Sequence, residues 1–197
     1  MLVFALTRWP GLMPLNFSAA YALMFCAGVY FPRKLVWWLP FATMFVTDIL
    51  LNWYYHEHYG SPLFGPELIG NYIAYVALVF LGRRFSVKAS FLKLLSGGLI
   101  GAILFYLITN TASWLFNPFH NLEYTRNFAG LWRALTTGIS GWPQTWEFFR
   151  NTFLSGGLFT GLFVGAMKLS ESAQEKEAGE KEPEEANGEE EPVEAKA

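Results

Sequence analysis

Five long apolar segments restrict the fold of this 197-residue chain more than any other feature of its sequence. A helix that crosses a bilayer needs about 20 predominantly apolar residues. The segments close to this length are Leu15–Phe31, Leu35–Leu51, Glu67–Gly82, Ala89–Ala112 and Phe148–Leu169. The sequence therefore predicts an all-α integral membrane protein.

Charge is scarce in most of the chain and concentrated at its C-terminal end. Hydrophobic residues make up 53% of the sequence and charged residues 15%, whereas about a quarter of the residues of a soluble domain are charged. Residues 1–169 hold eleven Lys/Arg and five Asp/Glu, and residues 170–197 hold three Lys and eleven Glu, so the two parts carry +6 and −8. The first part has too little polar surface for a soluble enzyme.

The opening segment Met1–Trp9 is apolar but reaches only half the length of a span. It has neither a charged n-region nor an A-x-A cleavage site, so we do not interpret it as a signal peptide. We interpret it as a short first helix or as a truncated start. The prediction is a compact bundle of six transmembrane helices, or of five if Met1–Trp9 does not cross.

Basic residues predict how the bundle is oriented. Two loops on one side hold Arg33, Lys34, Arg83, Arg84 and Lys88, while the loop at 52–66 has no Lys or Arg. Positively charged loops stay in the cytoplasm. We therefore expect a multi-pass protein of the inner (cytoplasmic) membrane with a cytoplasmic C-terminal tail.

The connection before the last span contains a predicted amphipathic helix, Arg126–Ser140. Its apolar residues recur at helical spacing and are Phe128, Leu131, Trp132, Leu135 and Ile139. We expect this helix in the outer interface or folded over the bundle as a lid, and the sequence leaves both alternatives open.

The segment 170–197 is predicted to be a disordered acidic tail, which leaves residues 1–169 as the transmembrane domain. It has no aromatic and almost no aliphatic residue. Such a segment buries too little apolar surface to offset the entropy lost on ordering.

Small residues spaced four apart predict close contacts between helices. Lipid tails give helices no hydrophobic reason to associate, so small residues that let two backbones approach supply the contact. Three such sets occur: Ser18, Ala22 and Cys26; Gly97 and Gly101; and Gly157, Gly161 and Gly165. The pattern leaves open whether the last set faces a helix of the same chain or another subunit.

Polar residues lie near the predicted outer ends of five helices, with Asn16 and Ser18 at the start of the first of these, and those of the other four are candidates for a binding site. Polar groups within a bilayer are costly and often functional. The candidates are Asp48, Asn71, Thr109, Asn110 and Asn151, with Trp114 as an aromatic neighbour. If they converge, they form a polar bowl open to the outside. Helix caps and helix contacts are the alternative roles of the asparagines, and for Asp48 a binding and a structural role are both open.

No pattern typical of an enzyme, cofactor or metal site occurs in the sequence. It contains no P-loop, GxGxxG, HExxH or GxSxG motif, and Cys26 is its only cysteine. The run His56-Glu57-His58 has loose spacing and no evident third ligand. We therefore predict no catalytic residues, no cofactor and no metal.

Three stretches resemble an uncharacterised bacterial membrane family over most of residues 10–168. The first combines Asn16-Phe17-Ser18, the basic turn Arg33-Lys34 and a helix that ends in Thr47-Asp48. The others are FYLITNTASW and FFRNTFLSGGLFTGLFVG. The family is similar in architecture to the substrate-binding S components of energy-coupling-factor (ECF) vitamin transporters. This resemblance implies six helices and an outward-facing pocket.

We therefore expect a membrane subunit that captures a small, vitamin-like molecule from the outside for uptake. Separate transmembrane coupling and ATPase subunits would supply the energy. A flat heterocyclic ligand suits the many Trp and Tyr rings, on which it can stack. The alternative is a non-transporting membrane scaffold that gathers partners through its glycines and acidic tail. Both alternatives place the chain in membrane lipid, and neither involves nucleic acid.

Overall fold

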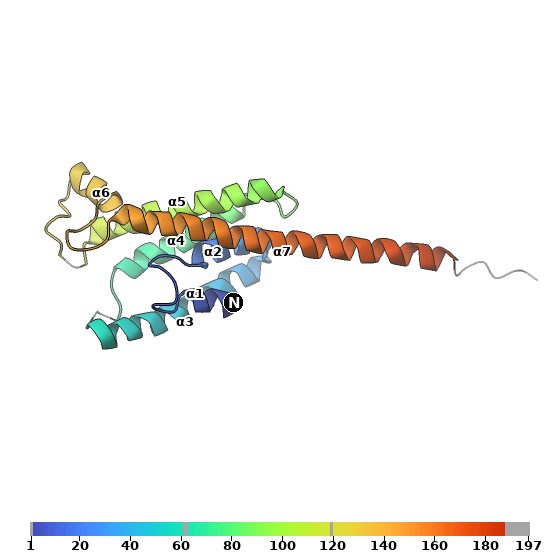
Figure 1. Cartoon of the computed structure of the whole chain (residues 1–197), viewed down its shortest axis with the longest axis horizontal. Coiled ribbons are helices and arrows are strands. Elements are labelled where there is room, and N and C mark those ends of the chain that lie inside the picture. Colours follow the sequence, from blue (N-terminus) through green and yellow to red (C-terminus); the bar gives the residue numbers. More distant parts are fainter. Residues whose placement is uncertain (1, 61–62, 119, 188–197) are drawn as a thin grey trace, which may run out of the picture.

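The computed structural model describes residues 2–60, 63–118 and 120–187, and within these ranges the chain forms seven helices and no strand. They are α1 (Leu2–Thr7), α2 (Ala20–Tyr30), α3 (Arg33–Tyr59), α4 (Glu67–Gly82), α5 (Phe91–Phe116), α6 (Phe128–Leu135) and α7 (Thr145–Asn187). Most of them run roughly along one axis, and α7 extends well past the others (Figure 1). The all-helical class predicted from the sequence is confirmed.

Three helices are long and apolar enough to cross a membrane: Arg33–His58, Phe91–Phe116 and Thr145–Lys176. α2 and α4 are apolar but shorter, with 11 and 16 residues. At 1.5 Å per residue, α2 covers only about half of a hydrocarbon core of about 30 Å. The structure thus supports a membrane protein, while the bundle of six spans stays a prediction.

The predicted span Leu15–Phe31 is helical only from Ala20 onward. Before it, Asn16 adopts a left-handed backbone conformation with φ of 59°. The backbone N–H of Ala20 donates to Ser18 Oγ (3.1 Å), and the Tyr21 hydroxyl donates to the Asn16 carbonyl (3.0 Å). These bonds hold residues 16–19 outside the helix, which the apolar composition alone did not reveal.

The core forms around α2, in which every residue from Ala20 to Val29 is buried. α2 packs against α3, α4, α5 and α7. At the crossing with α4, Gly28 and Gly82 bring the two backbones together, and a Cβ atom on either glycine would collide with backbone atoms of the other helix. A short helix therefore holds the bundle together from its centre.

The glycines of α7 face α5 of the same chain. Gly157, Gly161 and Gly165 lie against Leu99, Leu95 and Phe91, respectively. These contacts repeat every four residues along the two antiparallel helices. The predicted small-residue face of α7 therefore makes a contact within the chain. The closest contacts lie beside it, where Gly98 meets Thr160 and Gly156 meets Ala102.

The other two predicted sets of small residues also pack inside the bundle, with one exception. Gly97 lies against the rings of Phe25 and Phe85, and Gly101 lies against Leu78. Ala22 and Cys26 are buried in α2, but Ser18 precedes the helix.

The turns between α2 and α3 and between α4 and α5 lie at the same end of the bundle (Figure 1). The basic residues predicted to be cytoplasmic are therefore close in depth, and Lys168 Nζ of α7 donates to the Val87 carbonyl of the second turn (3.2 Å). α7 then continues to Asn187, into the segment predicted to be disordered. Glu, Ala and Lys favour helix. The division into domains stays a prediction, as does the orientation, and residues 188–197 lie outside the described residues.

A helix does occur between α5 and α7, but α6 is shorter than the predicted Arg126–Ser140. Asn127 caps its start by accepting a bond from the Gly130 N–H (2.9 Å), and Gly138, with φ of 73°, lies just beyond its end. The Tyr106 hydroxyl of α5 donates to the Leu135 carbonyl and fixes α6 on the bundle (2.5 Å).

Candidate functional site

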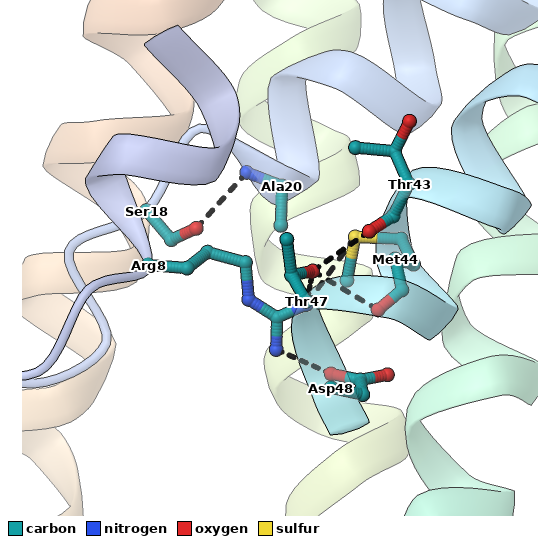
Figure 2. A network of polar contacts seen from close by, with 7 residues as sticks. All are labelled: Arg8, Ser18, Ala20, Thr43, Met44, Thr47 and Asp48. Carbon is teal, nitrogen blue, oxygen red and sulfur yellow. Dashed lines mark hydrogen bonds and ion pairs between the residues drawn. The ribbon is translucent and has the colours of Figure 1, made fainter. Parts of the chain in front are cut away.

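A buried ion pair joins the end of α1 to the middle of α3 (Figure 2). Arg8 Nη2 donates to Asp48 Oδ1 at 2.5 Å, and Arg8 Nη1 donates to Thr47 Oγ1 at 2.9 Å and approaches Met44 Sδ at 3.5 Å. The side chains of Arg8 and Asp48 are only 12% and 8% exposed. The lone acid predicted within the spans thus has a cationic partner, so its charge is balanced.

Local hydrogen bonds position both partners of this pair. The Thr47 hydroxyl lies within hydrogen-bonding distance of the Thr43 carbonyl (2.9 Å), which turns its oxygen toward Arg8. On the other side, Thr7 Oγ1 accepts a bond from the Ala19 N–H (3.1 Å), so the end of α1 is tied to the start of α2. Arg8 is therefore held between α2 and α3.

A cavity of about 400 Å³ lies beside Arg8. Its wall consists of the loop between α1 and α2, the residues of α1 and α2 that flank this loop, and side chains from α3, α4 and α5. Irregular backbone at membrane depth is tolerated where it lines a cavity. The non-helical residues that shorten α2 therefore form one wall of the candidate site.

Three of the predicted site residues lie on the wall of this cavity: Asn71, Thr109 and Asn110. The Thr109 hydroxyl donates to the Phe105 carbonyl (2.9 Å), and Asn110 Nδ2 donates to the Tyr106 carbonyl (2.9 Å). Both bonds use donors, so the oxygens of the two side chains keep lone pairs for other partners. The structure brings these residues together, and their binding role stays a prediction.

The other three predicted site residues do not line the cavity. Asp48 lies behind Arg8, to which it is bonded. The Trp114 indole N–H donates to the Thr125 carbonyl (2.8 Å), so Trp114 holds the loop before α6. Asn151 Nδ2 donates to the Leu15 carbonyl (2.9 Å) and ties α7 to the loop that lines the cavity. The hydrogen bonds of these three side chains connect parts of the fold to one another.

The sequence reasoning missed Arg8 and the tyrosines Tyr21 and Tyr75, which line the cavity together with Asn16. One signal for Arg8 was present, because it is the only charged residue in Met1–Trp9 and Asp48 is the only acid deep in a span. A single cation and a single acid in apolar surroundings favour each other as partners.

The cavity wall suits a ligand that forms hydrogen bonds but carries no net charge. Amides and hydroxyls provide donors and acceptors, and Trp9, Phe17 and Phe105 provide aromatic faces. The guanidinium of Arg8 is the charge at the wall, and Asp48 neutralises it. An anionic ligand would have to compete with Asp48 for Arg8.

The motif His56-Glu57-His58 lies near the C-terminal end of α3, where the ring of His58 stacks on Tyr54 at a centroid distance of 4.1 Å. Within the described ranges, no three His, Cys, Asp or Glu side chains gather in a group that could hold a metal ion.

A family model described as a family of unknown function, DUF6580, matches residues 1–178. The chain belongs to this family. The match extends from α1 through the bundle into α7, so the ion pair and the cavity lie in the part of the chain shared with DUF6580. The comparison with curated proteins found no match, and neither did the comparison with solved structures. The similarity to ECF S components therefore stays a prediction.

Proposed function

We propose that the protein is a membrane subunit that captures a small, vitamin-like molecule from the outside for uptake, with separate ATPase subunits as the source of energy. The observation that carries this proposal is the cavity of about 400 Å³, whose wall includes Asn71, Thr109 and Asn110. Ligand sites in proteins are usually concave and about 300–1,000 Å³ in volume.

The position of the cavity supports capture rather than catalysis. Its wall is assembled from the loop after α1 and from α2, α3, α4 and α5, so a ligand would contact several helices at once. The polar groups on the wall are mainly amides and hydroxyls, which can hold a ligand by hydrogen bonds. A ligand held in this way can be released intact.

The charge at the wall favours a neutral ligand over an anion. Arg8 is bonded to Asp48, Thr47 and Met44, and an anion would gain its attraction only by weakening the bond to Asp48. A carboxylate deprived of its partner in a buried site is strongly destabilised.

Purification in mild detergent followed by mass spectrometry of co-purifying small molecules tests this proposal. We expect one enriched small molecule that is reduced in Asn71→Ala and Asn110→Ala, because both amides line the cavity. Asn52→Ala is the matched control, since Asn52 lies on α3 outside the lining. Equal amounts of the molecule in all variants would contradict the proposal.

A membrane scaffold is the second candidate function, and α7 is the observation that favours it. The helix continues to Asn187 and projects past the bundle, in an acidic stretch of sequence (Figure 1). Truncation after Leu169 separates the two candidates. If the truncated protein loses partner proteins but keeps the small molecule, the scaffold is a role additional to capture. If it loses partner proteins and no small molecule is bound before or after truncation, the scaffold alone is favoured.

A further inference from the structure

A second cavity, of about 170 Å³, lies between α1 and α3. Ala5, Leu6 and Leu50 line it together with Tyr54, so it is predominantly apolar. Leu6 is 58% exposed and Leu50 is 51% exposed. Leu50 lies on α3, which is long enough to cross a membrane, and an exposed apolar side chain on such a helix faces lipid, so this groove opens toward the bilayer.

The apolar groove and the polar cavity share one wall. Arg8, Trp9, Pro10 and Leu51 line both of them. The two spaces therefore both adjoin the short segment that follows α1. A molecule bound in the polar cavity needs to extend only past this wall to enter the groove.

The two spaces differ in chemistry in the way that the two ends of an amphiphile differ. The cavity presents Asn71, Thr109 and Asn110, whereas the groove presents a mainly apolar surface that includes Ala5, Leu6 and Leu50. Since the charge of Arg8 is balanced by Asp48, neither space offers an unpaired charge at the shared wall.

We infer that the ligand is a neutral amphiphile with one chain: its uncharged polar head occupies the cavity, and its alkyl or isoprenoid chain lies in the groove between α1 and α3. This inference rests on the proposed capture of a small molecule and specifies its chemical class. The small volume of the groove limits the ligand to a single chain, and the opening toward the bilayer lets a long chain continue into lipid.

Two probes with the same neutral head and different chains test the inference: 1-acetylglycerol and 1-decanoylglycerol. The full chain is placed in phosphatidylcholine nanodiscs, and saturable binding is measured by competition between unlabelled and radiolabelled 1-decanoylglycerol. At equal free aqueous concentration, we expect the decanoyl probe to compete at least about tenfold better than the acetyl probe, because each methylene group that passes from water into the groove contributes about fourfold to affinity.

Variants separate the groove from the cavity and from the surrounding lipid. Ala5→Phe fills the groove and should weaken decanoylglycerol binding about tenfold or more, with a smaller effect for Ala5→Leu. Ala166→Phe is the matched control, because Ala166 is exposed on α7 and lines neither space, and it should bind like the unmodified protein. Asn110→Leu should weaken both probes. Partition of the probe into lipid is the same for all variants, so it cancels in these comparisons.

Equal competition by both probes, together with unchanged binding in both Ala5 variants, would overturn the inference. If Asn110→Leu still weakened binding in that case, the proposed capture of a small molecule would stand without the chain. Absence of saturable binding for both probes would also overturn the inference, and the proposed function would then be judged by the co-purification experiment. Thermal unfolding of each variant tests whether a loss of binding reflects a loss of fold.

Discussion

Arg8 and Asp48 neutralise each other's charge in a part of the chain that otherwise contains few charged residues. A charge removed from water is tolerated when a partner and further hydrogen bonds compensate it. Here Asp48 supplies the partner and Thr47 supplies an additional bond to Arg8. One oxygen of Asp48, Oδ2, is buried and has no hydrogen-bond partner among the described residues. The pair is therefore balanced in charge but not fully hydrogen-bonded.

Removal of one charge should cost far more stability than removal of both. Asp48→Asn leaves the Arg8 guanidinium buried without a counter-charge, which should cost about 3–5 kcal/mol. Arg8→Met combined with Asp48→Leu leaves no charge behind and should restore much of the loss. Thermal unfolding in detergent measures both variants against the unmodified protein. A double variant as unstable as Asp48→Asn would contradict this account.

Two tyrosine hydroxyls offer a matched comparison of hydrogen bonding. The Tyr106 hydroxyl donates to the Leu135 carbonyl, so Tyr106→Phe should cost about 1 kcal/mol and loosen α6. The Tyr30 hydroxyl is buried without a hydrogen-bond partner among the described residues, so Tyr30→Phe should be neutral or stabilising. Unfolding temperatures of the two variants check the difference, and equal losses would show that the bond to Leu135 contributes nothing.

At the scale of elements, glycine positions decide which helices approach closely. Spacing of four residues identified the α7 face that meets α5, because residues four apart lie on one side of a helix. It did not identify the closest contacts at Gly28, Gly82 and Gly98. Those depend on which side chain lies opposite, and a single sequence does not contain that information.

Gly98→Ala and Gly161→Ala should therefore differ in sign. A Cβ atom on Gly98 would lie within the side chain of Thr160, and such overpacking typically costs about 1–3 kcal/mol. A Cβ atom on Gly161 would have its nearest neighbours at 3.8 Å, so the gain in helix propensity of up to about 1 kcal/mol should remain. Thermal unfolding of the two variants in the same detergent tests this. If Gly161→Ala were destabilised, α7 would pack against α5 more closely at Gly161 than the distance of 3.8 Å indicates.

For the whole molecule, composition predicted the all-helical class and the membrane environment, and apolar length located the long helices. The loop between α1 and α2 escaped prediction because Leu15–Ala19 is apolar enough for a span, and only the bonds around Asn16 and Ser18 hold it outside the helix. For the same reason the candidate site was predicted in part. Asn71, Thr109 and Asn110 were identified because they lie near predicted helix ends. Arg8 reaches the cavity only because the chain after α1 forms an irregular turn, which the sequence pattern did not predict.

The orientation of the whole molecule can be tested at its two ends. Leu122 is 94% exposed in the connection between α5 and α6, and Ser86 is exposed in the basic turn between α4 and α5 at the other end. Basic turns stay in the cytoplasm. On intact cells, an impermeant thiol reagent should therefore label Leu122→Cys and leave Ser86→Cys unlabelled, and permeabilised cells should show labelling of both. Native Cys26 is fully buried in α2 and gives no background. Labelling of Ser86→Cys alone on intact cells would reverse the orientation and place the cavity on the cytoplasmic side, so that uptake from the outside would no longer fit.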